Sequence, residues 1–541
     1  MASIVILEHE LQRYVELQYM AVGWVLSLCL SAAAFAQSSS APAPAPRFDI
    51  EAFVVDGNTL IAQKEVDALV SPFAGKQRNF GDIQRALEAL QASYLGRGYN
   101  AVRVLVPEQD VRSGRVRLQV IEARIRNVRI EGNKFFDNDN IRASLPALKE
   151  GTAPNTRDIG ANVTLANENP VRQARVVLES TPAVGQVDAV VRVTDDEPWR
   201  TTAFFDNSGN PTTGHYRAGL GLLNANFGGA DHVLNLQAIT SPTQFEDVLI
   251  VGAGYRVPMY GANALFDLYG GYSDVDAGTL ADLFSVSGSG TIAGARYTQV
   301  LPRLGSYEQK LALGLEWKAF DNDVVLVGST ITLVPDATTF PLLISYTGRD
   351  QEPGRDFAFF VTYAANHPYG DGDASRQAIE ASRAGAKARF QILRFGASYS
   401  LALPQDNIFR AALDGQYTQD ALIPGEQFGL GGLNSVRGFY ERSTAHDIGH
   451  RVSFEMYGPE VGPLFAPDWR ARILGFIDAG RGKDQAPVRL AASGLMSVGV
   501  GGRATRGKNL SLRFDFALVT DGTASRDTGK SRTHFGVAYT F

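Results

Sequence analysis

The chain has 541 residues, 55 of them glycine, with 10% aromatic residues, 20% charged residues and a formal net charge of −6. This length exceeds one ordinary domain, so more than one domain is expected. The mild negative charge and the lack of a long basic stripe argue against a nucleic-acid partner. The glycine and aromatic content favours many aromatic-rich strands that are separated by turns.

The amino-terminal region is interpreted as a signal peptide at residues 1–36 and a short Pro/Ala-rich linker at residues 37–47. Met20–Ala36 is an apolar run that ends in small residues before Gln37, which is typical of a secretory cleavage site. A membrane-anchoring helix is the alternative, but the run is short for a membrane span. The residues before this run are more acidic than a usual signal peptide, which favours a translation start downstream of Met1.

The sequence contains no pattern that indicates an enzyme. Its only cysteine, Cys29, lies in the apolar run, so the mature chain is expected to lack disulfides, zinc-finger-type sites and a cysteine nucleophile. His446 and His450 would stand about 13 Å apart in an extended strand, too far to share a metal ion. No helical pattern follows Gly429–Gly432, so this stretch is not a phosphate-binding loop. We therefore predict no catalytic residue, no metal and no cofactor.

Residues 48–125 show the pattern of a small α/β domain with the order β-α-α-β-β. Apolar residues recur at the spacing of one helical face in Gln63–Val70 and in Asp82–Leu95. Two alternating strands follow, around Val104 and Leu118.

Residues 126–198 repeat this order after about 75 residues, which indicates an internal repeat of small domains. Their Gly132-Asn133 turn corresponds to Gly57-Asn58 of the first domain. The order resembles the periplasmic polypeptide-transport-associated (POTRA) domain, here as a tandem pair. Asn167–Pro170 followed by Arg172 resembles the second such domain of two-partner secretion transporters.

Residues 199–541 are interpreted as a transmembrane antiparallel β-barrel of about 16 strands. The acidic run Asp195–Pro198 just before it is interpreted as a solvated inter-domain hinge rather than a catalytic cluster. In Leu311–Trp317 and Leu510–Leu518, large apolar residues alternate with small or charged ones. A wall between lipid and a polar lumen needs this alternation, so outer-membrane lipids are an expected partner. The predicted strand centres are residues 204, 221, 236, 252, 268, 294, 314, 344, 360, 393, 412, 454, 475, 499, 515 and 537.

The last strand carries apolar and mostly aromatic residues on one face. These residues are Phe535, Val537, Tyr539 and Phe541. Because lipid does not tolerate an open sheet edge, this strand is expected to close the barrel against the first strand. It also resembles the carboxy-terminal signal that the outer-membrane assembly machinery recognises, so this machinery is an expected partner during biogenesis.

The central loop, Phe428–Thr444, is long and rich in glycine, which is typical of a functional loop. A flexible surface loop is the alternative. The strand count places the central loop between the eleventh and twelfth strands, on the extracellular side, with enough length to fold back into the lumen. Its Val436-Arg437-Gly438-Phe439 segment matches the loop signature of outer-membrane assembly and secretion barrels.

The thirteenth strand carries a second motif of the same barrels. Phe476–Gly480 matches the pattern Phe-x-Asp-x-Gly, and strand alternation points Asp478 inward. The resemblance implies that Asp478 pairs with Arg437, a bidentate contact suited to holding a loop against a wall. Two unrelated lumenal charges are the alternative. The predicted site residues are Val436, Arg437, Gly438, Phe439, Phe476, Asp478 and Gly480.

Taken together, the tandem POTRA-like domains, the two motifs and the aromatic terminus resemble the haemolysin secretion and activation family (ShlB/FhaC/HecB), which belongs to the BamA-like superfamily. The resemblance implies a monomeric two-partner secretion transporter in the outer membrane of a Gram-negative bacterium. Its POTRA domains would lie in the periplasm and catch an unfolded partner exoprotein, a large β-rich adhesin or haemolysin, partly by adding a strand to a sheet edge. The barrel would export this partner.

Two other functions remain open for such a barrel. A passive porin would lack the repeated domains, and an assembly or insertion factor of the same superfamily usually has more of them. Many family members also carry an amino-terminal plug helix, and a membrane-spanning helix needs about 20 residues. Because Gln37–Arg47 is too short to supply one, we expect that either the Arg437 loop alone closes the resting pore or the pore leaks.

Overall fold

The structure is a computed structural model. It describes residues 46–211, 213–246, 248–275, 278–280, 284–286, 289–321, 335–464, 466–485, 493–522 and 527–541. The predicted signal peptide, residues 37–45 of the predicted linker and Cys29 lie outside these ranges. The chain divides into two compact units. The first unit extends to Glu122 but does not include residues 97–101. Those residues belong to the second unit, together with all residues from Ala123 onward.

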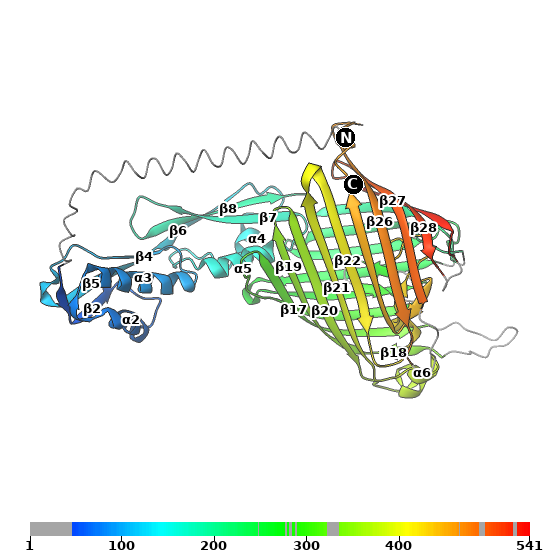
Figure 1. The fold of residues 1–541 in the computed structure, drawn as a ribbon, viewed down its shortest axis with the longest axis horizontal. Coiled ribbons are helices and arrows are strands. Elements are labelled where there is room, and N and C mark those ends of the chain that lie inside the picture. Colours follow the sequence, from blue (N-terminus) through cyan, green and yellow to red (C-terminus); the bar gives the residue numbers. More distant parts are fainter. Residues whose placement is uncertain are drawn as a thin grey trace, which may run out of the picture. The chain divides into compact units, whose positions relative to one another are not determined.

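The first unit is a small α/β domain (Figure 1). Its main sheet has the order β2-β5-β4, in which β2 is parallel and β4 antiparallel to β5. Helix α2 buries Val66 and Val70, and helix α3 buries Leu90 and Tyr94; each pair is four residues apart and lies on one helical face. A two-stranded sheet, β1–β3, was not predicted. The elements are β1 (Phe48–Ile50), β2 (Ala52–Asp56), α2 (Gln63–Val70), η2 (Ser71–Phe73), β3 (Gly75–Arg78), α3 (Phe80–Gly96), β4 (Val102–Leu105), η3 (Val111–Ser113) and β5 (Arg115–Glu122).

The second unit begins with another α/β domain of the same design. Its sheet has the order β6-β8-β7, again with the first strand parallel and the last antiparallel to the central strand. Asp137 and Asn155 cap its two helices through side-chain oxygens that accept backbone N–H bonds. The elements are β6 (Arg124–Glu131), α4 (Asn138–Ser144), α5 (Thr156–Ala166), β7 (Arg172–Ser180) and β8 (Gln186–Asp195). Among the described residues, no helix is long and apolar enough to cross a membrane.

The two α/β domains share one turn after their first strand. Gly57 and Gly132 have φ angles of +83° and +90°. A Cβ on either would come 2.3 or 2.4 Å from the carbonyl oxygen of Val120 or Val193, respectively. Glycine alone accommodates this backbone and this close approach without strain. In each domain the asparagine that follows donates to a carbonyl three residues later, so the repeated Gly-Asn pair is a structural turn.

The prediction of a solvated hinge is wrong for Asp195. Its side chain is buried and accepts backbone N–H bonds of 2.9 to 3.0 Å from residues 134–136. Glu122 plays the same part in the first domain, where it accepts bonds from the backbone N–H groups of Thr59 and Leu60 at 2.7 and 3.0 Å. An acidic residue at the end of the central strand therefore holds the turn in each domain, because a carboxylate satisfies several donors at once.

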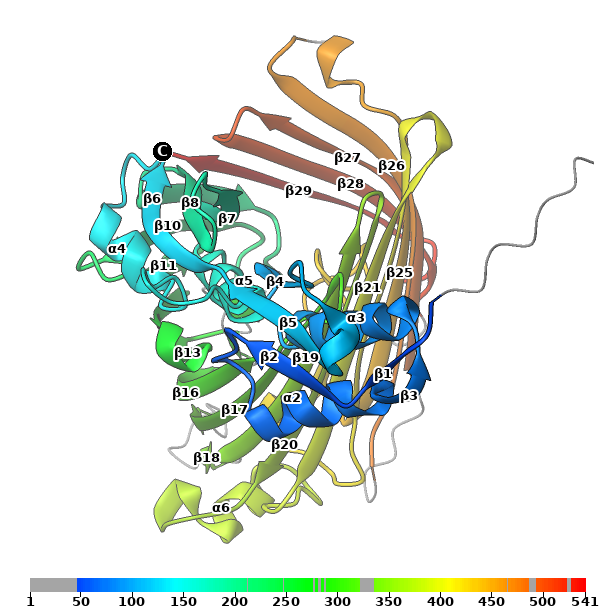
Figure 2. The same cartoon turned by 90° about the vertical axis from the view of Figure 1, so that its left-hand side faces the viewer.

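The rest of the second unit is a closed antiparallel β-barrel (Figures 1 and 2). Both β18 and β19 pair with β17 and form one interrupted strand, so the wall has sixteen strands, and β29 pairs with β9 to close it. Each of the sixteen predicted strand centres falls inside an observed strand. The barrel strands are β9 (Trp199–Asp206), β10 (Arg217–Phe227), β11 (His232–Thr240), β12 (Leu249–Met259), β13 (Ala264–Ser273), β16 (Gly290–Val300), β17 (Tyr307–Phe320), β18 (Ala337–Thr339), β19 (Pro341–Glu352), β20 (Arg355–Asn366), β21 (Gln391–Leu403), β22 (Asn407–Tyr417), β25 (Ile448–Tyr457), β26 (Trp469–Lys483), β27 (Ser493–Arg506), β28 (Leu510–Asp521) and β29 (Ser531–Thr540).

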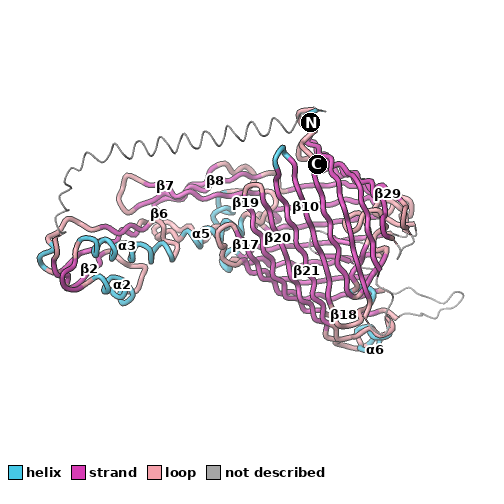
Figure 3. The backbone as a smooth tube through the Cα atoms, viewed as in Figure 1, coloured by secondary structure: helices cyan, strands magenta, loops and turns pink. Residues whose placement is uncertain are grey.

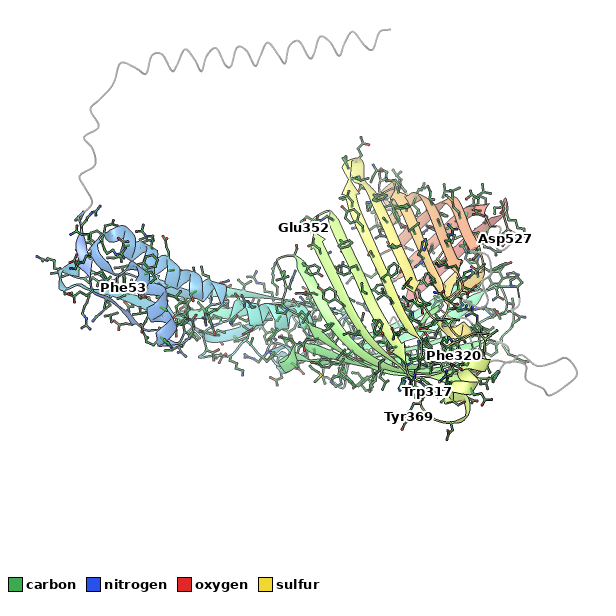
Figure 4. The ribbon with its side chains drawn as sticks, turned by 60° about the horizontal axis from the view of Figure 1, so that its bottom comes forward. Phe53, Trp317, Phe320, Glu352, Tyr369 and Asp527 are labelled. Carbon is green, nitrogen blue, oxygen red and sulfur yellow. The ribbon has the colours of Figure 1, made fainter. Side chains whose placement is uncertain are left out.

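The wall has two different ends. We call the end where the chain enters at β9 and leaves at β29 the entry end, and the opposite end the loop end. Glu352 lies at the entry end, and Phe320 lies at the loop end (Figure 4). Most helical turns in the connections are short, and α6 lies at the loop end (Figure 3). The remaining elements are η4 (Tyr260–Ala262), β14 (Gly278–Leu280), β15 (Phe284–Val286), η5 (Gly372–Ala374), α6 (Arg376–Ala381), η6 (Pro404–Asp406), η7 (Pro424–Glu426), β23 (Phe428–Leu430), β24 (Thr444–His446) and η8 (Gly462–Leu464).

Side chains of the wall alternate between lipid and lumen, as the sequence predicted. On β17, Leu313 and Trp317 are 55% and 37% exposed on the outer face, whereas Glu316 is 6% exposed. On β28, Phe514 and Phe516 face outward and Asp515 is buried on the inner side. The wall therefore combines an oily exterior with a charged interior.

The second α/β domain packs directly onto two turns at the entry end of the barrel (Figure 2). Arg172 forms a 2.6 Å ion pair with Asp231, and the two side chains are 1% and 2% exposed. Arg172 also donates to Asn140 Oδ1 at 2.8 Å, and Tyr260 donates its hydroxyl to Asp231. Asn169 Nδ2 donates to Ala225 O at 2.7 Å. These contacts explain why the domain and the barrel form one compact unit.

Replacing Arg172 with Met should loosen the second α/β domain from the barrel. The change leaves Asp231 buried without its cation, which costs about 3 to 5 kcal/mol for a pair of this kind. Limited proteolysis of the full chain should then cut residues 124–195 several-fold faster, while the barrel keeps its heat-modifiable mobility. The matched control is Lys508→Ala, which removes the exposed 2.8 Å pair with Asp196 and should change nothing. Wild-type proteolysis of the Arg172→Met protein would contradict this role.

Candidate functional site

The central loop connects the eleventh and twelfth strands, β22 and β25. Its ends form a short hairpin of β23 and β24. Gly431 and Gly432 then turn the chain with φ angles of +102° and +115°, which glycine adopts without strain. The loop contacts strand residues that face away from lipid, so it lies inside the lumen.

Arg437 is the centre of the contacts between the central loop and the wall. Its side chain is 3% exposed. Nε and Nη2 donate to the two carboxylate oxygens of Asp478 at 2.6 and 2.8 Å, and the backbone N–H donates to Asp478 Oδ2 at 3.1 Å. Nη1 donates to Glu455 Oε1 at 2.8 Å and to Asp515 Oδ1 at 3.4 Å. The planar guanidinium matches a carboxylate with two parallel bonds, which sets both the position and the direction of the loop tip.

The charges around Arg437 are balanced. Asp515 accepts bonds from Arg503 at 2.9 and 3.1 Å and from Arg513 Nε at 2.7 Å. Arg513 in turn donates to Leu433 O and Asn434 Oδ1 of the central loop, both at 2.7 Å. Burying charged groups is tolerated only when each is paired and hydrogen-bonded. We call the following six residues the loop anchor: Arg437, Glu455, Asp478, Arg503, Arg513 and Asp515.

Apolar packing surrounds the loop anchor. Val436 and Phe439 are fully buried in a cluster with Leu430, Leu495 and Val519. The Arg437 guanidinium also lies 3.5 Å from the centroid of the Phe476 ring, which adds a cation–π contact.

Two glycines make room for this packing. A Cβ on Gly480 would come 2.8 Å from Leu430 Cδ2 and 3.1 Å from Val436 Cγ2. Gly438 has φ +95°, and a Cβ there would lie 3.1 Å from Val519 Cγ2. The structure therefore brings all seven predicted loop and strand residues into one place: Val436, Arg437, Gly438, Phe439, Phe476, Asp478 and Gly480. That this place controls the pore remains a prediction.

Several residues of the site were not predicted. Ser453 Oγ donates to Asp478 Oδ1 at 2.6 Å, and the backbone N–H of Gly438 donates to His534 Nε2 at 2.9 Å. Glu455 and Asp515 were missed as partners of Arg437. All these side chains occupy lumen-facing positions of the last strands, so strand alternation could have listed them as candidates. In the part of the chain that the structure describes, no group of His, Cys, Asp or Glu side chains could hold a metal ion.

The carboxy-terminal strand closes the barrel. β29 pairs with β9 from Gly536 opposite Asp206 to Thr540 opposite Thr202, and Phe541 N–H donates to Thr201 O at 2.8 Å. Four residues were predicted on the outer face of this strand. Phe535 is half-buried, whereas Val537, Tyr539 and Phe541 are 41%, 43% and 70% exposed. Their part as an assembly signal remains a prediction.

Replacing Phe541 with Ser should reduce the amount of folded barrel in the outer membrane several-fold. The lipid-facing row loses its terminal aromatic, which packs edge-on against Tyr539 with the ring centroids 4.9 Å apart. Heat-modifiable mobility of membrane fractions measures the folded amount, and Phe541→Trp should keep it. Equal amounts of folded Ser and Phe proteins would contradict the assignment.

Comparison with known proteins agrees with this architecture. The family model for the haemolysin secretion/activation protein ShlB/FhaC/HecB matches residues 185–504, and the model for the ShlB-type POTRA domain matches residues 48–123. The outer membrane transporter CdiB of Dickeya dadantii is 26% identical over 418 residues, which cover 75% of this chain and 71% of the relative. The heme/hemopexin transporter protein HuxB of Haemophilus influenzae is 21% identical and covers 82% of this chain and 78% of its own.

Solved structures show the same fold. CdiB from Escherichia coli superposes with a TM-score of 0.72 at 21% identity, covering 94% of this chain and 93% of that one. CdiB from Acinetobacter baumannii superposes with a TM-score of 0.67 at 16% identity, covering 92% and 91%. Since the family model matches more than half of the chain, the protein belongs to the haemolysin secretion/activation family ShlB/FhaC/HecB.

Proposed function

We propose that this protein is an outer-membrane pore that exports an unfolded partner exoprotein from the periplasm to the cell surface. The entry end faces the periplasm, together with both α/β domains, and the loop end faces outward. The observation that carries this proposal is the loop anchor, which holds a folded-in loop by Arg437 and Asp478 inside a barrel that follows POTRA-type domains. The family members are transporters, and the transport step needs no catalytic residue.

We further assign the second α/β domain, residues 126–198, as another POTRA domain, although the POTRA family model covers only the first. Its strand order and its Gly-Asn turn support this assignment. Among the described strands, β4 pairs only with β5 and β7 only with β8, so each domain keeps a free sheet edge. A free edge can accept an extended segment of an unfolded chain through backbone hydrogen bonds. The captured chain in this proposal is a large β-rich adhesin or haemolysin. The transporter itself is a single monomeric barrel that the assembly machinery inserts into the outer membrane.

The test is a secretion assay with the candidate passenger, a large repeat-rich secreted protein encoded near this chain. Cells that contain both proteins should release the passenger into the medium, and cells without the transporter should retain it. Assembly of an unrelated porin is measured in the same cells, because an insertion factor would change it and an exporter would not. Passenger release that does not depend on this chain would overturn the proposal.

A further inference from the structure

A second group of charged residues holds the same connection at a different part of the wall from the loop anchor. Glu426, in η7 just before the central loop, is 1% exposed. Its Oε1 lies 3.0 Å from Lys318 Nζ, and its Oε2 lies 2.6 Å from Arg394 Nη2. Lys318 is also 3.0 Å from Glu316 Oε2. We call these four residues, Glu316, Lys318, Arg394 and Glu426, the Glu426 cluster.

Further hydrogen bonds tie the Glu426 cluster to neighbouring strands. Gln416 Nε2 donates to the carbonyl oxygens of Glu426 and Asp447 at 2.9 and 3.1 Å, and Arg394 Nε donates to Gln416 Oε1 at 2.9 Å. Tyr269 donates its hydroxyl to Glu316 Oε1 at 2.7 Å. The wall strands involved are β13, β17, β21 and β22, whereas the loop anchor uses β25 to β28. The connection between β22 and β25 is therefore attached to two separate parts of the wall.

A lumenal cavity of about 580 Å³ reaches the strand positions next to Arg394 of the Glu426 cluster. On β21 the cavity reaches Gly396, and the next lumen-facing residue toward the loop end is Arg394. On β22 the cavity reaches Asp414, and the next lumen-facing residue toward the loop end is Gln416. On these two strands, Arg394 of the Glu426 cluster and Gln416, which donates to Glu426 O, therefore follow the cavity lining toward the loop end.

The other boundary of the cavity lies at the entry end. Glu168 of the second α/β domain lines the cavity and forms a 2.6 Å ion pair with Lys310 of β17. Other lining residues include Thr347, Arg349 and Ser398, together with the aromatic residues Phe359 and Phe360. The cavity therefore extends from Glu168 of the second α/β domain to Gly396, the lumen-facing position next to Arg394.

The segment that carries Glu426 is also covered at the loop end. Arg383, just after α6, donates to Leu422 O at 2.6 Å and to Asp447 Oδ1 at 2.7 Å, and lies 3.1 Å from Asp484 Oδ1. Ile379 of α6 is buried against Ile423. Tyr369 of the same connection lies at this end of the barrel (Figure 4). No part of this cover belongs to the loop anchor.

We infer that the Glu426 cluster is the outward gate of the export path, and that the loop anchor is the fixed support on which the connection turns. This inference rests on the proposed export function and names where that path is closed. Both groups consist of buried ion pairs, so their surroundings distinguish them. Apolar packing backs Arg437, whereas the cavity begins at the lumen-facing position next to Arg394, which holds Glu426.

The test measures ion conductance of the purified full chain in planar lipid bilayers. Glu426→Gln leaves Lys318 and Arg394 as two cations that share only Glu316, so their repulsion should open the gate. The open fraction should rise tenfold or more, and Lys318→Gln and Arg394→Gln should shift it in the same direction. Combining Glu426→Gln with Lys318→Gln should add little, because the two residues share one contact. The control is Glu380→Gln, which removes an exposed 3.0 Å pair with Arg376 and should conduct as the wild type does.

Heat-modifiable mobility shows which of these variants are folded. The conductance of any folded variant then tests whether the Glu426 cluster is the gate. Folded variants with wild-type conductance would overturn the gate, and so would a rise that Glu380→Gln reproduces. Conductance does not depend on a passenger, so failure of the proposed export function would show only as missing secretion by the wild type. Cells with an open gate should also become sensitive to a bulky antibiotic that the outer membrane normally excludes.

Discussion

Deletion of residues 48–122 should abolish secretion of the partner exoprotein while leaving a barrel that inserts and conducts ions. Apart from residues 97–101, the deleted residues form a compact unit of their own, and the barrel closes between β9 and β29 without them. The second α/β domain stays in place through the buried Arg172–Asp231 pair. Passenger in the medium should fall at least a hundredfold, since capture by a free sheet edge then depends on one domain instead of two. Immunoblots of medium and membrane fractions measure the passenger and the barrel separately.

The matched control for this deletion changes the same domain without unfolding it. Arg112→Ala removes an exposed pair with Asp110, in which the side chains are 88% and 61% exposed, and should leave secretion unchanged. Normal secretion by the deletion variant would show that the first domain is dispensable. Loss of the barrel from the membrane would instead show that the domain acts in assembly.

Arg437→Ala and Asp478→Ala should each lower export at least tenfold with little change in barrel abundance. Each change leaves the other charge buried without its partner, which costs about 3 to 5 kcal/mol of loop attachment. The wall keeps its sixteen strands because neither side chain takes part in strand pairing. The double variant should be little worse than either single variant, since the shared contact is already lost. Secretion and heat-modifiable mobility across the four proteins complete the cycle.

An exposed ion pair at the entry end provides the control cycle. Arg506 and Asp468 lie 2.6 Å apart, but their side chains are 59% and 51% exposed, so their single and double Ala variants should export normally. Strictly additive losses for Arg437 and Asp478 would show that the contact between them does not govern export. Secretion separates this site from the gate, because Glu426→Gln should raise the leak and preserve export, whereas Arg437→Ala should lower export.

The sequence determined the fold class and the strand positions of this protein. A strand between lipid and water needs large apolar side chains on alternate residues, and this requirement is local, so Leu313 and Trp317 could be assigned without knowing their neighbours. The order of the sixteen strands then followed, because consecutive strands of an up-and-down antiparallel barrel lie side by side in the wall. Phe476–Gly480 and Val436–Phe439 were likewise found as short motifs.

Only the tertiary structure decided which charges meet. Glu426 and Lys318 are 108 residues apart, and Arg437 and Asp515 are 78 residues apart. Strand alternation points such side chains into the lumen, but it does not say where a folded-in loop passes or which strands it touches. The sequence pattern did not reveal that Asp195 is buried. Its hydrogen-bond partners are backbone N–H groups, and their positions depend on a distant turn. Local periodicity therefore specified the wall, and contacts between distant segments specified the loop anchor and the Glu426 cluster.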